Sequence, residues 1–165
     1  MEKLEFRKLI TTLDKEIEAY EVLKDLFTEK REILKKAQSS DLVEVDNRII
    51  AQSNAITKLN KTRQKLSFDY TNKDCSMSDF IEIIGSENEQ YKTELEDRKV
   101  KICNIIPEIT LLNNQNVELL KHGIIISNKM LESIVDAFAP QGSYYNGAGK
   151  TDTHDLDMWT VNEEI

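Results

Sequence analysis

The chain is poor in the residues that interrupt helices and in those that favour sheets. Its 165 residues include 5 glycines and 2 prolines, and aromatic residues make up 7% of it. Charged residues make up 32%. The aromatic, glycine and proline content is low for a β-sandwich or a Rossmann-type sheet, and the composition is normal for long helices. These scarcities predict an all-α protein.

Cysteines and long apolar runs are also scarce, and the 30 acidic residues outnumber the 22 basic ones. The two cysteines, Cys75 and Cys103, lack CxxC spacing and paired histidines, so we expect reduced thiols. A formal net charge of −8 without a dense basic stripe argues against a nucleic-acid partner. No apolar run is long enough to insert into a membrane, and the N-terminal MEKLEFRKLI has no signal-peptide core. We therefore expect a cytoplasmic protein.

The sequence does contain apolar residues that recur at alternating steps of three and four. Two such seams predict helices over residues 3–38 and 41–71, with Asp41 and Glu44 forming a capping box at the start of the second. Because the connection is short, these helices are predicted to form an antiparallel hairpin with coiled-coil-like packing. The seams include four polar positions: Glu16, Lys30, Gln52 and Arg63.

A short helix and a third long helix are predicted to follow the hairpin. The short one is apolar, covers residues 79–84 and is expected to end at Gly85. Ser86 and Glu89 then form another capping-box pattern, which predicts a long helix over residues 87–138.

A proline lies inside this third helix. Pro107 cannot donate a backbone hydrogen bond to the carbonyl of Cys103, so we expect the helix to kink or break there. Residues 1–140 are thus predicted to form one helical bundle. Residues 141–165 are acidic, have no apolar period and are predicted to form a flexible C-terminal tail.

The second half of the third helix is more apolar than packing against a hairpin requires. Asn113 and Asn116 lie within its apolar stripe, in the segment LLNNQNVELL, and asparagine is costly to bury without a hydrogen-bond partner. Three explanations are open for them, namely that they fix a helix register, form a turn or bind another chain. Three alternatives are open for what covers the wide apolar surface: the other helices, a second copy of the chain or an incoming amphipathic helix.

Sequence patterns that suggest chemistry are weak. The segment GAGKT at residues 147–151 lacks the first glycine of a nucleotide-binding loop, because Tyr144 occupies that position. The acidic residues around His154 have no scaffold that would hold a metal. No Ser/His/Asp or Cys/His set lies on rigid elements, so we expect no catalytic residues, no metal, no cofactor and no enzyme activity.

The asparagine segment resembles that of a known family. The pattern LNxxNxxLL from Leu112 to Leu120, followed by Asn128 and an apolar helix end, resembles the FlgN-type chaperones of flagellar export, a form of type III secretion. The segment YNGAGKT at residues 145–151 is similar to the family's tyrosine-glycine tail motif. The resemblance covers most of the chain as an architecture and residues 109–151 specifically.

The resemblance implies a function in bacterial flagellum biogenesis. It implies a chaperone that binds the C-terminal helices of hook–filament junction proteins, prevents their premature assembly and delivers them to the export gate. Tyr145, with Tyr144, would dock on the cytoplasmic domain of the gate. The alternative is a coiled-coil scaffold or homo-oligomer without a client, and a homodimer of the free chaperone is a further expectation. The implied client-binding residues are Asn113, Asn116, Leu119, Leu120, Ile124, Ile126, Met130, Leu131, Ile134 and Phe138.

Overall fold

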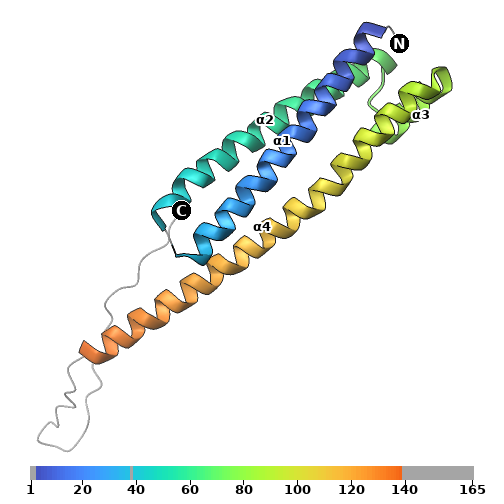
Figure 1. Ribbon diagram of the computed structural model, residues 1–165. Coiled ribbons are helices and arrows are strands. Elements are labelled where there is room, and N and C mark those ends of the chain that lie inside the picture. The colour runs from blue at the N-terminus through green and yellow to red at the C-terminus, as the bar shows by residue number, and fades with distance from the viewer. Residues whose placement is uncertain (1–2, 38, 139–165) are drawn as a thin grey trace, which may run out of the picture. The chain divides into compact units, whose positions relative to one another are not determined.

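The computed structural model describes residues 3–37 and 39–138, which form four α-helices packed together (Figure 1). The chain divides into two compact units, Met1–Ile124 and Ile125–Ile165. The all-α prediction is confirmed, and the predicted tail, residues 141–165, lies outside the described residues. The helices are α1 (Lys3–Lys35), α2 (Ser39–Thr71), α3 (Met77–Glu87) and α4 (Glu89–Phe138).

Polar side chains set the register of the antiparallel hairpin formed by α1 and α2. Near one end of the hairpin, the Lys30 ammonium lies 2.7 Å from an Asp46 carboxylate oxygen. Near the other end, Arg63 Nε donates a hydrogen bond of 3.0 Å to Glu16 Oε2. The polar positions of the predicted seams therefore pair across the hairpin, so they specify one alignment of the two helices.

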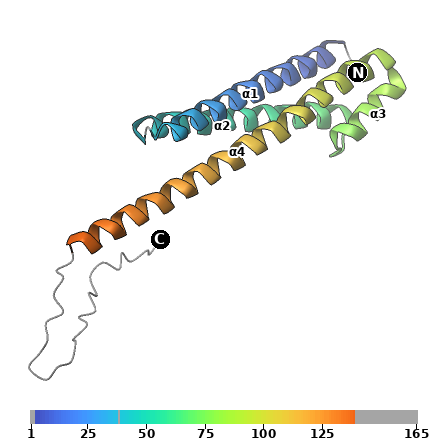
Figure 2. The same cartoon turned by 60° about the horizontal axis from the view of Figure 1, so that its bottom comes forward.

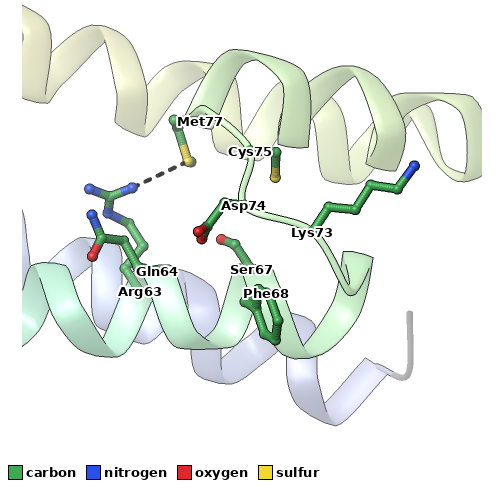
Figure 3. Close-up of a pocket in the computed structure, with 8 residues that line it drawn as sticks. All are labelled: Arg63, Gln64, Ser67, Phe68, Lys73, Asp74, Cys75 and Met77. Atoms are coloured by element: carbon green, nitrogen blue, oxygen red, sulfur yellow. Dashed lines mark hydrogen bonds between the residues drawn. The ribbon is translucent and has the colours of Figure 1, made fainter.

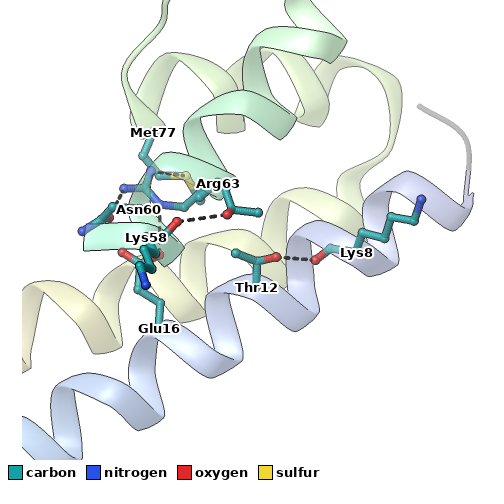
Figure 4. A network of polar contacts seen from close by, with 8 residues as sticks. Lys8, Thr12, Glu16, Lys58, Asn60, Arg63 and Met77 are labelled. Carbon is teal, nitrogen blue, oxygen red and sulfur yellow. Dashed lines mark hydrogen bonds and ion pairs between the residues drawn. The ribbon is translucent and has the colours of Figure 1, made fainter. Parts of the chain in front are cut away.

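The Glu16 side chain is the buried member of this network. It is 1% exposed, and Figure 4 shows it in a group with Asn60 and Arg63 of α2 and Met77 from the start of α3. Arg63 Nη2 donates a second hydrogen bond, of 2.8 Å, to Asn60 Oδ1. Burial raises the pKa of Glu16, and the charge of Arg63 opposes that shift. The Glu16–Arg63 ion pair thus links α1 to α2, although the buried Glu16 carboxylate loses its hydration.

The main hydrophobic core forms where α3 packs against the start of α1. The ring of Phe6 stacks on Tyr91 of α4 with centroids 3.7 Å apart, which joins the beginnings of α1 and α4. A smaller cluster of Ala19, Leu23 and Ile56 lies further along the hairpin. The buried residues of the main core are Phe6, Leu9, Leu13, Phe80, Ile81, Ile84 and Leu95.

The helix α3 is longer at both ends than the predicted residues 79–84. Its N-cap is Ser76, whose hydroxyl accepts the Asp79 N–H, while the Asp79 carboxylate accepts the Ser76 N–H. Gly85 lies inside the helix and does not end it. A Cβ at Gly85 would lie 2.6 Å from Cδ of Lys92, so the glycine permits a close approach of α4 to α3.

The predicted caps of α4 and α2 also differ from the structure. The side chain of Asn88 accepts the first free N–H groups of α4, from Gln90 at 3.0 Å and from Tyr91 at 3.3 Å. The predicted capping box of Ser86 and Glu89 is therefore wrong. The helix α2 begins at Ser39, so its predicted cap residue, Asp41, lies within its first turn.

Within the first unit, α4 runs parallel to α1. Arg98 of α4 donates two hydrogen bonds to the carboxylate of Asp14, at 2.8 and 3.1 Å. Lys24 of α1 donates one of 2.7 Å to Glu108. Both pairs are 84 residues apart in sequence, and a constant offset is what parallel helices require. In Figure 2, α3 and the beginning of α4 lie at the end of the bundle where α1 begins.

The helix α4 is continuous through Pro107, so of the predicted kink or break the break is wrong, and the kink stays a prediction. The side chains of Pro107 and Cys103 are both exposed, so the proline lies on the solvent face of the helix. Water then replaces the N–H partner that the Cys103 carbonyl loses, which lowers the cost of proline inside a helix. None of the described helices carries an apolar stretch long enough to cross a membrane.

Candidate functional site

Two rows of side chains run along α4 within the first unit, each at alternating steps of three and four residues. Each outer-row residue except Ile124 follows an inner-row residue by one position, which turns it by about 100° around the helix. Every side chain of the inner row is buried or half-buried, and Ile109 packs on the Leu23 cluster. The inner row is Ile102, Ile105, Ile109, Leu112, Asn116 and Leu119, and the outer row is Ile106, Thr110, Asn113, Val117, Leu120 and Ile124.

The predicted client-binding residue Asn116 lies in the inner row. It is 1% exposed, and its Nδ2 donates a hydrogen bond of 2.9 Å to the backbone carbonyl of Phe27 in α1. Its Oδ1 is also buried and has no hydrogen-bond partner among the described residues. The side chain therefore fixes where α4 sits along α1 in the free chain.

The second predicted asparagine, Asn113, lies in the outer row and is exposed. It is three residues before Asn116, yet its side chain points in a different direction because only Asn116 lies on the row that α1 covers. The structure thus separates two residues that the sequence pattern placed in one site.

The remaining predicted client-binding residues become more exposed toward the end of α4. Leu119 and Leu120 are half-buried. Every described side chain from Ile125 to Val135 is exposed. Phe138 is the last residue of α4, and its side chain lies outside the described part of the chain, as do Tyr144 and Tyr145. From Ile124 to Val135, the large apolar residues are 50 to 63% exposed, and they are Ile124, Ile125, Ile126, Met130, Leu131, Ile134 and Val135.

A concavity of about 370 Å³ lies between the last turns of α1 and the facing part of α4. Leu119 of the inner row contributes to it, and Arg31 brings a buried Nε without a partner among the described residues. The Lys121 hydrogen bond lowers the pKa of Glu118 on its rim. The sequence did not predict this concavity, because it requires α1 and α4 to lie side by side. It is lined by Arg31, Lys35, Asn114, Gln115, Glu118, Leu119 and His122.

A second concavity, of about 470 Å³, lies between the end of α2 and the segment before α3 (Figure 3). Cys75 lies in it with its sulfur 3.8 Å from the hydroxyl oxygen of Thr71, and no histidine is among the lining residues. A thiol without a neighbouring base does not form a nucleophile pair. Across residues 3–37 and 39–138, no group of three or more His, Cys, Asp or Glu side chains is placed to hold a metal ion.

Comparison with known protein families matches residues 1–153 of the chain to the family described as FlgN protein. The match covers the hairpin, α3, all of α4 and the segment that contains Tyr144 and Tyr145. No curated protein and no solved structure gives a significant match.

Proposed function

This chain belongs to the FlgN family and is a flagellar export chaperone for hook-associated proteins, and on that premise we propose that the exposed apolar end of α4 binds the C-terminal helices of its clients. FlgN chaperones are cytoplasmic and non-enzymatic. The chaperone prediction is therefore confirmed, and the scaffold without a client is set aside.

The observation that supports this surface is the exposure of large apolar side chains in residues 125–135. Met130 and Leu131 are at least 60% exposed, and Ile134 is 53% exposed. Exposed apolar surface of this extent on one helix favours the binding of a partner protein. Full burial of one such side chain contributes about 1.5–3 kcal/mol, so covering half of several contributes enough for specific binding.

An amphipathic helix is the partner that fits such a surface. Client helices that form coiled coils in the assembled filament present an apolar stripe before assembly. A stripe that is covered by α4 is not available to another client subunit, so binding delays assembly until export. Client binding thus performs the protective part of the function.

Delivery to the export gate is proposed to use Tyr145, with Tyr144 beside it. The support is the tyrosine-glycine motif in the sequence, since these residues lie outside the described part of the chain. A tyrosine supplies a large apolar ring with a polar tip, which suits a small transient contact. We expect Tyr145→Ala to keep client affinity and to lose binding to the cytoplasmic domain of the gate in a pull-down of the chaperone–client complex.

Titration calorimetry with the C-terminal fragment of a hook-associated protein tests the client surface. We expect binding near one to one, and we expect Ile134→Glu to weaken it by about tenfold or more because a carboxylate would be desolvated in the interface. Asn128→Glu is the matched control, since it adds the same single negative charge to the same helix at a polar position that does not line the hollow shared by Ile126, Met130 and Ile134. Equal affinities for Ile134→Glu and wild type, in a variant with unchanged helicity, would contradict this surface.

The free chaperone is also proposed to form a homodimer through the same apolar side chains. Light scattering with and without the client fragment tests this proposal. A dimer that the client converts into a one-to-one complex would support it, whereas a monomer at all concentrations would contradict it.

A further inference from the structure

We propose that the outer row of α4, from Ile106 to Ile124, is a second client-docking surface that takes an amphipathic helix of the hook-associated protein. This inference rests on the proposed function and extends it into the first unit, away from residues 125–135. Three of its residues were not predicted as binding residues from sequence: Ile106, Thr110 and Val117.

The two rows of α4 have the same spacing but different neighbours. The inner row is covered by α1, whereas in the outer row Ile106 is 42% exposed, Val117 is 39% exposed and Ile124 is 60% exposed. A helix with two apolar rows about 100° apart has room for a helix on each side. Within the first unit, α1 occupies one side, and the other side presents the same three-and-four pattern to solvent.

The outer row is also free of charge, in a chain of which 32% of the residues are charged. Between Asn104 and Ile124 the charged residues are Glu108, Glu118 and Lys121, and none of them belongs to either row. Glu108 pairs with Lys24 at 2.7 Å, and Glu118 pairs with Lys121 at 2.9 Å. The outer row is uncharged, and the charges beside it are already paired. It therefore fits the apolar stripe of a helix, and it has no free positive charge to bind a phosphate or an acidic peptide.

The sequence frame of the outer row points to the client as its occupant. From Ile124 the same spacing continues through Ser127 to Leu131 and Ile134, which are residues of the proposed client surface. The heptad spacing of the outer row is thus the spacing found among residues of the proposed client surface, so the same kind of client helix fits it.

Asn113 supplies the polar element of the outer row. In the inner row, Asn116 donates from its side-chain amide to a backbone carbonyl of the helix that covers it. Asn113 is the outer-row residue next to Leu112, three residues before Asn116, and is exposed. We assign it the corresponding bond to the client backbone, through which it selects one alignment of the client helix.

The test compares two variants of the full chain in titration calorimetry with the client's C-terminal fragment. Val117→Glu places a charge in the outer row, and we expect it to weaken binding by about tenfold or more. Leu111→Glu is the matched control, because Leu111 is 59% exposed on the same helix but belongs to neither row. We expect it to change the affinity less than about twofold. If Val117→Glu does not fold, Ile106→Glu takes its place at another turn of the row.

Hydrogen exchange gives an independent readout on the wild-type chain, in which client addition should increase protection of residues 106–120. If Val117→Glu binds like wild type while Ile134→Glu loses binding, this inference is overturned and the proposed function stands. If both variants bind like wild type, the proposed client surface on residues 125–135 fails as well. If Val117→Glu changes only the oligomeric state of the free chain, the row joins two copies and the client assignment is overturned.

Discussion

Replacing Asn116 by leucine is expected to stabilise the chain, although it removes a hydrogen bond between two helices. The asparagine side chain is almost fully buried and uses only its Nδ2, on the Phe27 carbonyl, while Oδ1 is buried without a partner among the described residues. Leucine is similar in size and carries no polar atoms. It therefore removes both the bond and the unpartnered oxygen.

The magnitude follows from three contributions. Loss of the bond costs about 0.5–1.5 kcal/mol, and the Phe27 carbonyl is not left unpartnered because it lies inside α1 and keeps its place in the helical hydrogen-bond ladder. Removal of the unpartnered Oδ1 returns about 1–3 kcal/mol. Burial of the leucine side chain adds about 1.5–3 kcal/mol. The balance favours the Asn116→Leu variant by about 3 kcal/mol.

Urea denaturation followed by circular dichroism measures this difference in the free energy of unfolding. Asn116→Ala is the control, since it removes the bond and the unpartnered oxygen as leucine does but leaves a cavity in place of the leucine contacts, and we expect it to be less stable than Asn116→Leu by about 1.5–3 kcal/mol. Destabilisation of Asn116→Leu by more than about 1 kcal/mol, at an unchanged denaturant slope, would refute the reasoning. It would mean that Oδ1 has a partner in solution.

Three further predictions concern single side chains. Because the folded chain holds the Glu16 proton more tightly than the unfolded chain, stability should fall as pH rises from 4.5 through the raised pKa, and Glu16→Gln should lack this fall in urea titrations at several pH values. Gly123→Ala should raise the free energy of unfolding by up to about 1 kcal/mol, since nothing lies within 4 Å of an added Cβ, and thermal denaturation checks it. Arg98→Lys should lower stability by about 0.5–1 kcal/mol, because lysine cannot bond both oxygens of Asp14; a double-mutant cycle with Asp14→Ala isolates this interaction.

The hairpin was predictable because its signal is both periodic and long. The seams also showed that Glu16, Lys30 and Arg63 lie among apolar residues. Their partners were not predictable, since a seam gives the face of a helix and not its alignment with the next one. The alignment of the two helices depends on which acidic side chain pairs with which basic side chain when the hairpin forms.

The helix ends were harder to predict because short patterns recur. Ser76 with Asp79 and Ser86 with Glu89 both place a hydroxyl three residues before an acid, and only the first pair forms a capping box in the structure. Gly85 suggested a helix end, but α3 continues past it. In both cases the packing of α3 against α1 and α4 overrides a local signal.

The candidate site was predictable as a segment and not as a set of residues. Asn113 and Asn116 both fit an apolar track of alternating threes and fours, because two such tracks lie one residue apart on α4. The position of α1 decides which track is buried, and the sequence does not give that position. Tyr145 stays a prediction that rests on the tail motif.

The parallel arrangement of α1 and α4 has a consequence for the order in which the chain folds during its synthesis. The two helices of the hairpin are complete once the ribosome has passed Thr71. Phe6 and Leu13 nevertheless belong to a core that also needs Phe80 and Leu95. These two residues are synthesised later, so the core cannot form until then. Contacts so distant in sequence form late, so the nascent chain carries an open apolar face through much of its translation.

The helix that ends this exposure is α4, the same element that carries the proposed client surfaces. A chain that ends before α4 would therefore have an incompletely covered core and would lack the proposed client surfaces. The chain thus completes its own core and gains its proposed client surfaces in the same last stage of synthesis.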